Sequence, residues 1–465
     1  MIADLRPYPA YKDSGIEWLG SLPAHWNKLR AKCIFREVDE RSTTGREELL
    51  SVSHLTGVTP RSQKTITMFL AKSNVGHKTC RPDDVVINTM WAWMGALGTA
   101  RQTGIVSPAY GVYRPLAGCN ILPRYADQLL RTPEYTAEYQ RRSTGVNSSR
   151  LRLYPEQFLR ISVVVPPPSE QAAIVRFLDW ANGRLVRAIR AKRKVIALLN
   201  EQKQAIIRRA VTHGLDPSVP LKPSGIPWLG DIPDHWNVRK LRSLFQVQGS
   251  GTTPSGDRYY GGAISWVMSG DLNDSVVKKT KQTVHGQALT AYSTLKLYPP
   301  NSLVVAMYGA TIGKTGDLAE AACTNQACCV LAQPKPEVSV PLMQLVLQTA
   351  KPHLLREAYG GGQPNINANV VRSLRVPFPP FKEQNLILTH VDKTTSRLAV
   401  AVSRLEREID FLREYRIRLV ADVVTGKLDV RVAAAKLPEE PSPDTSEEDA
   451  DLIIDPEAAD EELAV

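Results

Sequence analysis

The chain has 465 residues, 43% of them hydrophobic, which is enough for two or three domains with ordinary cores. No apolar run is long enough to span a bilayer and no signal peptide is recognisable, so we expect a soluble, cytoplasmic protein. The six cysteines show no Cys-x-x-Cys pair and no ligand spacing with histidine. This pattern favours idle thiols in a reducing compartment and predicts no metal site.

Charge is distributed unevenly along the chain. The formal net charge is +11, but residues 437–465 contain twelve acidic residues and no basic ones, so residues 1–436 carry a net charge of +23. A folded body this basic indicates a polyanionic partner, although an ordinary solvated surface is the alternative. The acidic tail, 432–465, is rich in Pro, Glu, Asp and Ser, and we expect it to be disordered.

The chain contains an internal duplication. After a proline-rich start, residues 14–27 read SGIEWLGSLPAHWN and residues 224–237 read SGIPWLGDIPDHWN, which are identical at ten of fourteen positions. The repeated tryptophans and the repeated His25 and His235 could mark a site. An aromatic staple at the base of each of two domains is the better interpretation.

Each repeat continues with short Val- and Ile-rich runs between Gly, Pro and Asn turns, which predicts a domain with a bent sheet and a few short helices. Two long helical segments follow these domains, at residues 170–211 and 383–424, and each begins with Glu-Gln after prolines. The expected parts are a first domain at 1–165, a first long helix at 166–216, a second domain at 217–378, and a second long helix at 379–431.

Both helical segments carry apolar residues at alternating steps of three and four, the period that packs one helix along another. We therefore predict a mixed α+β fold, in which two bent-sheet domains are separated by two long helices that form an intramolecular antiparallel coiled coil. An intermolecular coiled coil is the alternative. The expected packing residues are Ile174, Leu178, Leu185, Val195, Leu199, Ile206, Ile387, Val391, Leu398, Leu405, Leu412 and Leu419.

Two segments resemble catalytic or nucleotide-binding motifs but lack essential parts. Residues 309–315, GATIGKT, are one residue shorter between the glycines than a phosphate-binding loop. Residues 378–381, FPPF, lack the Asn or Asp that opens the adenine methyltransferase motif and holds the amino group of a flipped base. We therefore predict no catalytic residue and no cofactor bound by this chain.

Aromatic, amide and cationic residues recur on the predicted loops of both domains. Asn and Gln pair with adenine, and Arg and Lys with guanine, in the DNA major groove. Ordinary polar loop chemistry is the alternative for any single residue, but the set favours double-stranded DNA as the partner. The candidates are Trp91, Trp93, Arg101, Gln102, Ser107, Tyr110, Asn147, Ser148, Arg150, Arg258, Tyr259, Tyr260, Tyr308, Lys314, Asn325, Gln326, Gln363, Asn365 and Asn367.

The chain resembles the specificity subunit of type I restriction-modification systems. The resemblance rests on the twin openings, the Pro-Pro…Glu-Gln helix starts, the strings at 85–93 and 307–314, and the VTGKL exit at 424–428. It implies two target recognition domains that read a bipartite, asymmetric DNA site, with the long helices as the spacer.

The same resemblance implies partners for the chain. These are two methyltransferase subunits and the restriction subunits, which would carry S-adenosylmethionine, ATP and magnesium. A basic tandem-domain scaffold for protein partners is the alternative function, and a methyltransferase in its own right is a weaker one.

Overall fold

The computed structural model describes residues 5–63, 73–145, 151–360 and 364–438, so most of the acidic tail lies outside the described residues. The chain divides into two compact units. The first unit comprises residues 1–194 with 405–465, and the second comprises residues 195–404. Each unit joins one sheet domain to part of each long helix, and each is described below by itself.

The duplicated openings build the same small structure in both units. In the first unit, β1 (Tyr11–Asp13) pairs with β2 (Ser21–Pro23), and β3 (Asn27–Arg30) pairs with β12 (Ser162–Val165), all antiparallel. The second unit repeats these pairs with β13 (Leu221–Pro223) and β14 (Asp231–Pro233), and with β15 (Asn237–Lys240) and β24 (Arg375–Phe378). Trp26 and Trp236 are completely buried, which agrees with a structural role for the repeated tryptophans.

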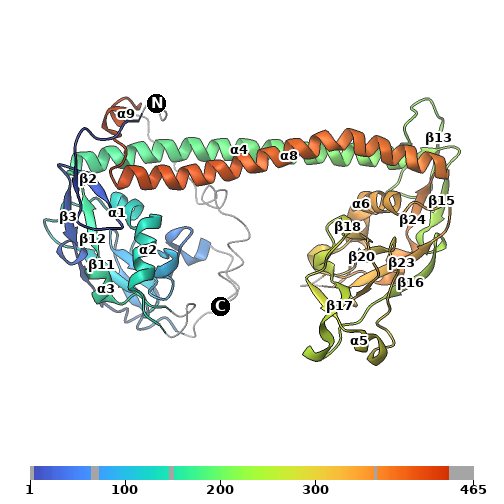
Figure 1. Cartoon of the computed structure of the whole chain (residues 1–465), viewed down its shortest axis with the longest axis horizontal. Helices are drawn as coiled ribbons and strands as arrows, with labels where there is room; N and C mark the ends of the chain where they lie inside the picture. Colours follow the sequence, from blue (N-terminus) through green and yellow to red (C-terminus); the bar gives the residue numbers. More distant parts are fainter. Residues whose placement is uncertain (1–4, 64–72, 146–150, 361–363, 439–465) are drawn as a thin grey trace. The chain divides into compact units, whose positions relative to one another are not determined.

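The first unit is built around an antiparallel four-stranded sheet in the order β4-β11-β8-β9, of which β11 is labelled in Figure 1. Its inward residues form one core with the short helices and with the nearby ends of the long helices. The elements are β4 (Phe35–Glu37), β8 (Val85–Ile87), β9 (Leu97–Thr99), β11 (Gly111–Pro115), the pairs β5 (Leu50–Ser53) with β6 (Gly57–Pro60) and β7 (Lys78–Cys80) with β10 (Gly104–Val106), α1 (Pro123–Leu130), α2 (Pro133–Arg142) and α3 (Pro155–Leu159).

The second unit has a five-stranded sheet in the order β16-β23-β20-β21-β18 and a three-stranded sheet in the order β19-β17-β22. The smaller sheet carries its own apolar cluster, separate from the main core. The elements are β16 (Phe245–Ser250), β17 (Tyr260–Val267), β18 (Ser275–Val277), β19 (Gln282–Val284), α5 (Gly286–Ala291), β20 (Leu303–Ala306), β21 (Thr315–Leu318), β22 (Ala322–Thr324), β23 (Cys328–Pro334), α6 (Val340–Arg356) and α7 (Ala368–Ser373).

The long helices are α4 (Pro168–His213) and α8 (Phe381–Val424). The repeated Glu-Gln explains how each is anchored. The buried Gln171 amide accepts a hydrogen bond from Leu122 N at 2.7 Å and donates to Asn120 O and Pro166 O. Gln384 does the same with Ser339 N, Glu337 O and Pro379 O. Each glutamine therefore satisfies loop backbone groups that would otherwise be buried unpaired.

The two helices pack antiparallel within each unit, which confirms the predicted intramolecular pair. In the first unit Lys192 Nζ lies 2.6 Å from Glu408 Oε2, and Arg416 Nε donates to Asn182 Oδ1 at 3.1 Å. In the second unit Ile207 and Val211 share a core with Ile387 and Val391. A short helix, α9 (Arg431–Ala435), follows α8.

Burial follows the predicted seam near the helix ends and departs from it in the middle of α4. Val195 is 44% exposed, whereas its neighbour Ile196 is half-buried, so the buried stripe has moved by one residue. A straight helix turns every 3.6 residues, whereas the assumed repeat is 3.5, and this mismatch accumulates with length. The other eleven packing residues are buried, namely Ile174, Leu178, Leu185, Ile387, Val391 and Leu419, or half-buried, namely Leu199, Ile206, Leu398, Leu405 and Leu412.

Candidate nucleic-acid interface

The same loop follows an inner strand of the main sheet in both units. After β8, Asn88 N donates to Ala96 O at 2.9 Å, and after β20, Ala306 N donates to Lys314 O at 2.8 Å. Gly95 and Gly313 close the two loops with φ of 86° and 76°, a conformation that favours glycine. The sequences 88–96 and 306–314 therefore occupy equivalent places.

In the second unit, several predicted residues gather at this end of β20. Ala306 pairs with Cys328, so the turn that precedes β23 lies beside the loop that follows β20. That turn contains Asn325 and Gln326, and Met307 N donates to Ala327 O at 2.8 Å. Tyr308, which is 41% exposed, and the half-buried Lys314 belong to the same loop. The sheet end therefore presents an aromatic ring, a cation and two amides together.

Two of the predicted amides have structural duties that reduce their availability to a ligand. Asn325 Oδ1 accepts a hydrogen bond from Ala327 N at 3.1 Å and so shapes the turn. Asn367 caps α7, where its Oδ1 accepts from Asn369 N at 2.9 Å and Val370 N at 3.1 Å. Asn367 Oδ1 therefore has no acceptor site left and Asn325 Oδ1 has one, whereas bidentate pairing with adenine requires a free carbonyl acceptor beside the NH₂ group.

In the first unit, Trp91, Trp93, Ser107 and Tyr110 meet at the equivalent end of β8. Tyr110 lies just before β11, whose Gly111 pairs with Ile87 at the end of β8. Asn88 Nδ2 donates to the Tyr110 hydroxyl at 3.2 Å, and Trp93 Nε1 donates to Met90 O at 2.9 Å. Both tryptophans are half-buried, so part of each ring remains accessible at the surface.

Arg101 and Gln102 do not join this group. Thr99 pairs with Val85, and Asp83 N donates to Ala100 O at 2.9 Å, so the exposed residues 101–102 lie at the opposite end of β8. A strand of this sheet separates them from Tyr110. Of the six described candidates in the first domain, four therefore lie at one end of β8 and two at the other.

Tyr259 and Tyr260 belong to the packing of the smaller sheet. Tyr259 is 8% exposed and makes an edge contact with Tyr292 at 5.4 Å, while Tyr260 contacts Trp266 at 5.4 Å. Arg258 stacks over the Tyr259 ring at 4.8 Å and donates to its hydroxyl at 2.9 Å. Burial in this apolar cluster makes a structural role the better explanation for both tyrosines. Asn147, Ser148, Arg150 and Gln363 lie outside the described residues.

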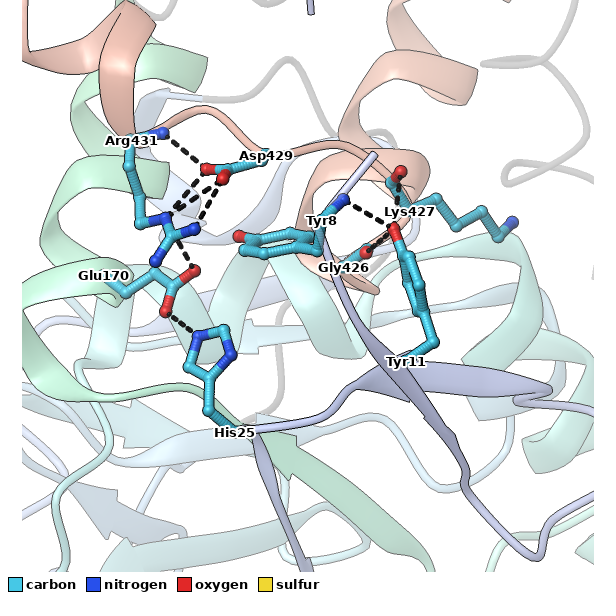
Figure 2. A network of polar contacts seen from close by, with 8 residues as sticks. All are labelled: Tyr8, Tyr11, His25, Glu170, Gly426, Lys427, Asp429 and Arg431. Atoms are coloured by element: carbon cyan, nitrogen blue, oxygen red, sulfur yellow. Dashed lines mark hydrogen bonds and ion pairs between the residues drawn. The ribbon is translucent and has the colours of Figure 1, made fainter. Parts of the chain in front are cut away.

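The repeated histidines sit in structural polar networks. His25 Nε2 lies 2.8 Å from Glu170 Oε2. Figure 2 shows this contact, with Arg431 between Glu170 and Asp429. Tyr11 donates to Gly426 O at 3.1 Å, so this network ties the start of the first unit to the segment after α8. His235 Nε2 repeats the contact with Glu383 Oε2 at 2.9 Å. Both histidines therefore contact the first turn of a long helix, His25 that of α4 and His235 that of α8.

The glycine loop at 309–315 is unsuited to phosphate. Asp274 Oδ1 accepts hydrogen bonds from Thr315 N at 2.9 Å and from Thr315 Oγ1 at 3.0 Å. A carboxylate therefore already occupies the groups that a nucleotide would need. Among the described residues, no cluster of three His, Cys, Asp or Glu side chains could hold a metal ion, and no helix has the length and apolar character to cross a membrane.

All six cysteines are free thiols. Burial raises the pKa of Cys323 and of Cys329 to about 11, and it raises the pKa of Cys80 to about 12. A thiol with such a pKa carries little thiolate near neutral pH and is a poor nucleophile and metal ligand.

Known proteins resemble this chain in sequence. A family model described as "Type I restriction modification DNA specificity domain" matches residues 233–404, which lie in the second unit. The type I restriction enzyme MjaVIII specificity subunit of Methanocaldococcus jannaschii is 24% identical over 312 residues, which cover 65% of this chain and 69% of that protein. The chain is therefore similar in sequence to specificity subunits of type I restriction-modification systems.

A second curated relative and a solved structure also resemble the chain. The MjaIX specificity subunit of the same organism is 26% identical over 167 residues, and the chain spans only 38% of its length. Both curated relatives are named specificity subunits. A solved structure described as "Structural basis underlying complex assembly and conformational transition of the type I R-M system" has a TM-score of 0.61 at 15% identity. It covers 88% of this chain and 99% of its own, which supports the mixed α+β fold with its long helices.

Proposed function

We propose that the chain is the DNA-recognition subunit of a type I restriction-modification complex, in which each unit reads one half of a bipartite, asymmetric site. The observation that carries this proposal is the equivalent pair of surface loops at 88–96 and 306–314. The two loops share two backbone hydrogen bonds, Asn88 N to Ala96 O with Ala306 N to Lys314 O, and Met94 N to Trp91 O with Ile312 N to Gly309 O, but differ in their side chains. Two similar supports with unlike contact residues are suited to two unlike half-sites.

The rest of the molecule fits the same role. Residues 1–436 carry a net charge of +23, which favours binding to the phosphate backbone. The long helices have 46 and 44 residues, a length of about 65–70 Å at 1.5 Å per residue, and we propose that they set the spacer between the half-sites.

The proposed partners rest on the resemblance to specificity subunits of type I restriction-modification systems. The helices would dock two methyltransferase subunits in the cytoplasm, and restriction subunits would complete the assembly. S-adenosylmethionine, ATP and magnesium would be bound by those partners.

The test is selection of bound duplexes from a random pool, with the chain co-purified with its methyltransferase subunit. Two short, unlike blocks at a fixed spacing would support the proposal and supply the target. A single block would mean that one unit reads no bases. DNA retained at low salt without any enriched block would contradict sequence reading and favour a basic scaffold for protein partners.

A paired substitution sharpens this test. Tyr308→Ala with Lys314→Ala removes a ring and a cation from one loop, and the backbone should tolerate it because Ala96 occupies the place of Lys314 in the first unit. One block should change while the other stays as in the unaltered chain. Loss of both blocks without loss of folding would point to one composite site instead.

A further inference from the structure

In the second unit, Tyr308, Asn365 and Tyr359 form a row, side by side on three neighbouring backbone segments at the same sheet end. Tyr359 and Asn365 exchange backbone hydrogen bonds at 3.0 and 2.8 Å. On its other side Asn365 pairs with Tyr308, because Gly309 N donates to Pro364 O at 2.8 Å and Ile366 N donates to Met307 O at 2.9 Å. Asn365 therefore lies between Tyr308 and Tyr359.

The pairing fixes where these side chains project. Residues directly opposite each other in an antiparallel pair place their side chains on the same face, about 5 Å apart. Tyr308 is 41% exposed and Tyr359 is 58% exposed, so this face is open to solvent. No hydrogen bond joins the Asn365 amide to another side chain or backbone group in the described part of the chain. Its carbonyl and its NH₂ group are both available, whereas the carbonyl of Asn325 accepts one hydrogen bond and that of Asn367 accepts two.

The first unit contains a similar row with different side chains, in which one of the two hydrogen bonds to the neighbouring loop is present. Thr144 and Arg152 exchange backbone hydrogen bonds at 3.0 and 2.9 Å, as Tyr359 and Asn365 do. Leu153 N donates to Thr89 O at 2.9 Å, which places Arg152 beside Met90. Arg152 and Asn365 each precede a short helix by three residues, since α3 starts at Pro155 and α7 at Ala368. The two residues are therefore structural equivalents.

Arg152 is as available as Asn365. Its side chain is exposed, and no ion pair or side-chain hydrogen bond links its guanidinium to the residues that the structure describes. A guanidinium can donate two parallel hydrogen bonds to O6 and N7 of guanine. A carboxamide can accept from N6 and donate to N7 of adenine. The two units thus present different base-reading groups from the same position.

We infer that Arg152 and Asn365 are specificity-determining residues, with Arg152 reading a guanine in the half-site of the first unit and Asn365 reading an adenine in that of the second. This inference rests on the proposed function and adds the chemistry of one base pair in each half-site. Arg152 is flanked by Met90 and Thr144, and Asn365 is flanked by Tyr308 and Tyr359. These flanking side chains limit how far the neighbouring base pairs can shift.

The experiment repeats the duplex selection on the same two-subunit complex with single variants. Arg152→Ala should remove the preference for guanine at one position of one block and weaken binding of the selected site by about 5- to 150-fold. Asn365→Ala should remove a preference for adenine at one position of the other block by a similar factor. In each case the remaining positions of both blocks should be unchanged.

Two kinds of variant separate base reading from simple charge. Arg152→Lys keeps the charge but loses the planar fork, so it should also lose most of the guanine preference. Arg160→Ala and Asn369→Ala are matched controls, because both residues are exposed and lie outside the row. Neither control should alter a base preference. Thermal unfolding of each variant confirms that the fold is retained.

The possible failures are distinguishable. If Arg152→Ala weakens binding equally to all sequences and lowers the salt dependence by about one ion, Arg152 contacts a phosphate and the inference is wrong. If neither variant changes the selected blocks, the row does not face the bases, although the two-block recognition would stand. If the unaltered complex selects no blocks, the proposed function fails together with this inference.

Discussion

The indole N–H of Trp236 donates a hydrogen bond to Glu383 Oε2 at 3.0 Å, and the same oxygen lies 2.9 Å from His235 Nε2. The first unit has the equivalent residues, His25, Trp26 and Glu170, but only one of the two equivalent hydrogen bonds. Glu170 contacts His25 at 2.8 Å, whereas the indole N–H of Trp26 has no partner among the described residues. Sequence identity in the repeated motif therefore conceals a difference in hydrogen bonding.

This difference predicts unequal effects of the same substitution. Trp236→Phe removes ring volume and a hydrogen bond to a carboxylate, whereas Trp26→Phe removes a similar volume and a buried N–H that has no partner. We expect Trp236→Phe to cost about 1–3 kcal/mol more in unfolding free energy than Trp26→Phe. Hydrogen exchange of the backbone amides of β14 and of β2 measures the local stability around Trp236 and around Trp26 separately. Equal costs would show that the indole bond contributes nothing.

Asp84 and Arg114 provide a second prediction, because they form a two-bond ion pair with a buried carboxylate. Arg114 Nε and one terminal nitrogen each lie 2.9 Å from an Asp84 oxygen, and the Asp84 side chain is 1% exposed. Arg114→Met would leave that carboxylate buried without its partner, so we expect a loss of about 3–5 kcal/mol in unfolding free energy.

The matched control is Arg41→Met, which breaks an exposed pair with Asp39 at 3.0 Å. It should cost less than about 1 kcal/mol. Thermal and urea unfolding give the loss in unfolding free energy for both variants, and hydrogen exchange assigns that loss to the first unit. A cost for Arg114→Met as small as that of the control would mean that water reaches Asp84 readily.

Glu138 makes the stability of the first unit dependent on pH. Burial raises the pKa of its carboxyl, but hydrogen bonds from Arg141 and Arg142 outweigh burial and leave the pKa below its usual value of 4.5. A depressed folded-state pKa means that the stabilisation is fully present above about pH 4.5 and is lost as the pH falls through the folded-state value. Glu138→Gln should therefore flatten the decline of stability below pH 4.5.

Unfolding midpoints measured between pH 3 and 7 test this prediction. Glu201→Gln is the control, because Glu201 is an exposed residue of α4 and should leave the acid limb of the curve as it is. An unchanged acid limb in Glu138→Gln would assign the loss of stability at low pH to other carboxylates.

The sequence predicted the larger features of this molecule because they leave local, repeated signals. The twin openings, the Pro-Pro…Glu-Gln starts and the apolar stripes identified two similar units and two long helices. Sequence could not place the stripe in the middle of α4, where Val195 faces outward, because drift depends on the packing partner. The functions of Gln171 and Gln384 were also missed, since their partners lie in distant loops.

The candidate site was harder to predict, because its residues meet through backbone pairing between distant segments. Asn325, Asn365 and Asn367 look alike in sequence, yet one shapes a turn, one caps a helix and one is left available. Tyr359 and Arg152 carry no local signal, since each becomes notable only through its strand partner. A search for residues three positions before the short helix of each repeat would have found Arg152 and Asn365 together.

Arg416 gives a last prediction, because it brings a charge into the helix pair. Its Nε donates to Asn182 at 3.1 Å, and no carboxylate in the described chain pairs with it. Burial, assisted by the charge of Arg131, lowers the pKa of its guanidinium to about 10, so the group is still charged at neutral pH. A folded-state pKa below the unfolded value means that the charged form destabilises the fold at pH 7, and that this penalty shrinks as the pH rises above 10.

Arg416→Met keeps the length of the side chain and removes the charge, so we expect it to raise the unfolding free energy by about 1–3 kcal/mol at pH 7. The advantage over the unaltered chain should diminish above pH 10. Arg418→Met is the control, because that side chain is 82% exposed and its change should stay within about 1 kcal/mol. If Arg416→Met destabilises the chain at pH 7, the hydrogen bond to Asn182 outweighs the cost of burying the charge. The arginine would then stabilise the pairing of α4 with α8.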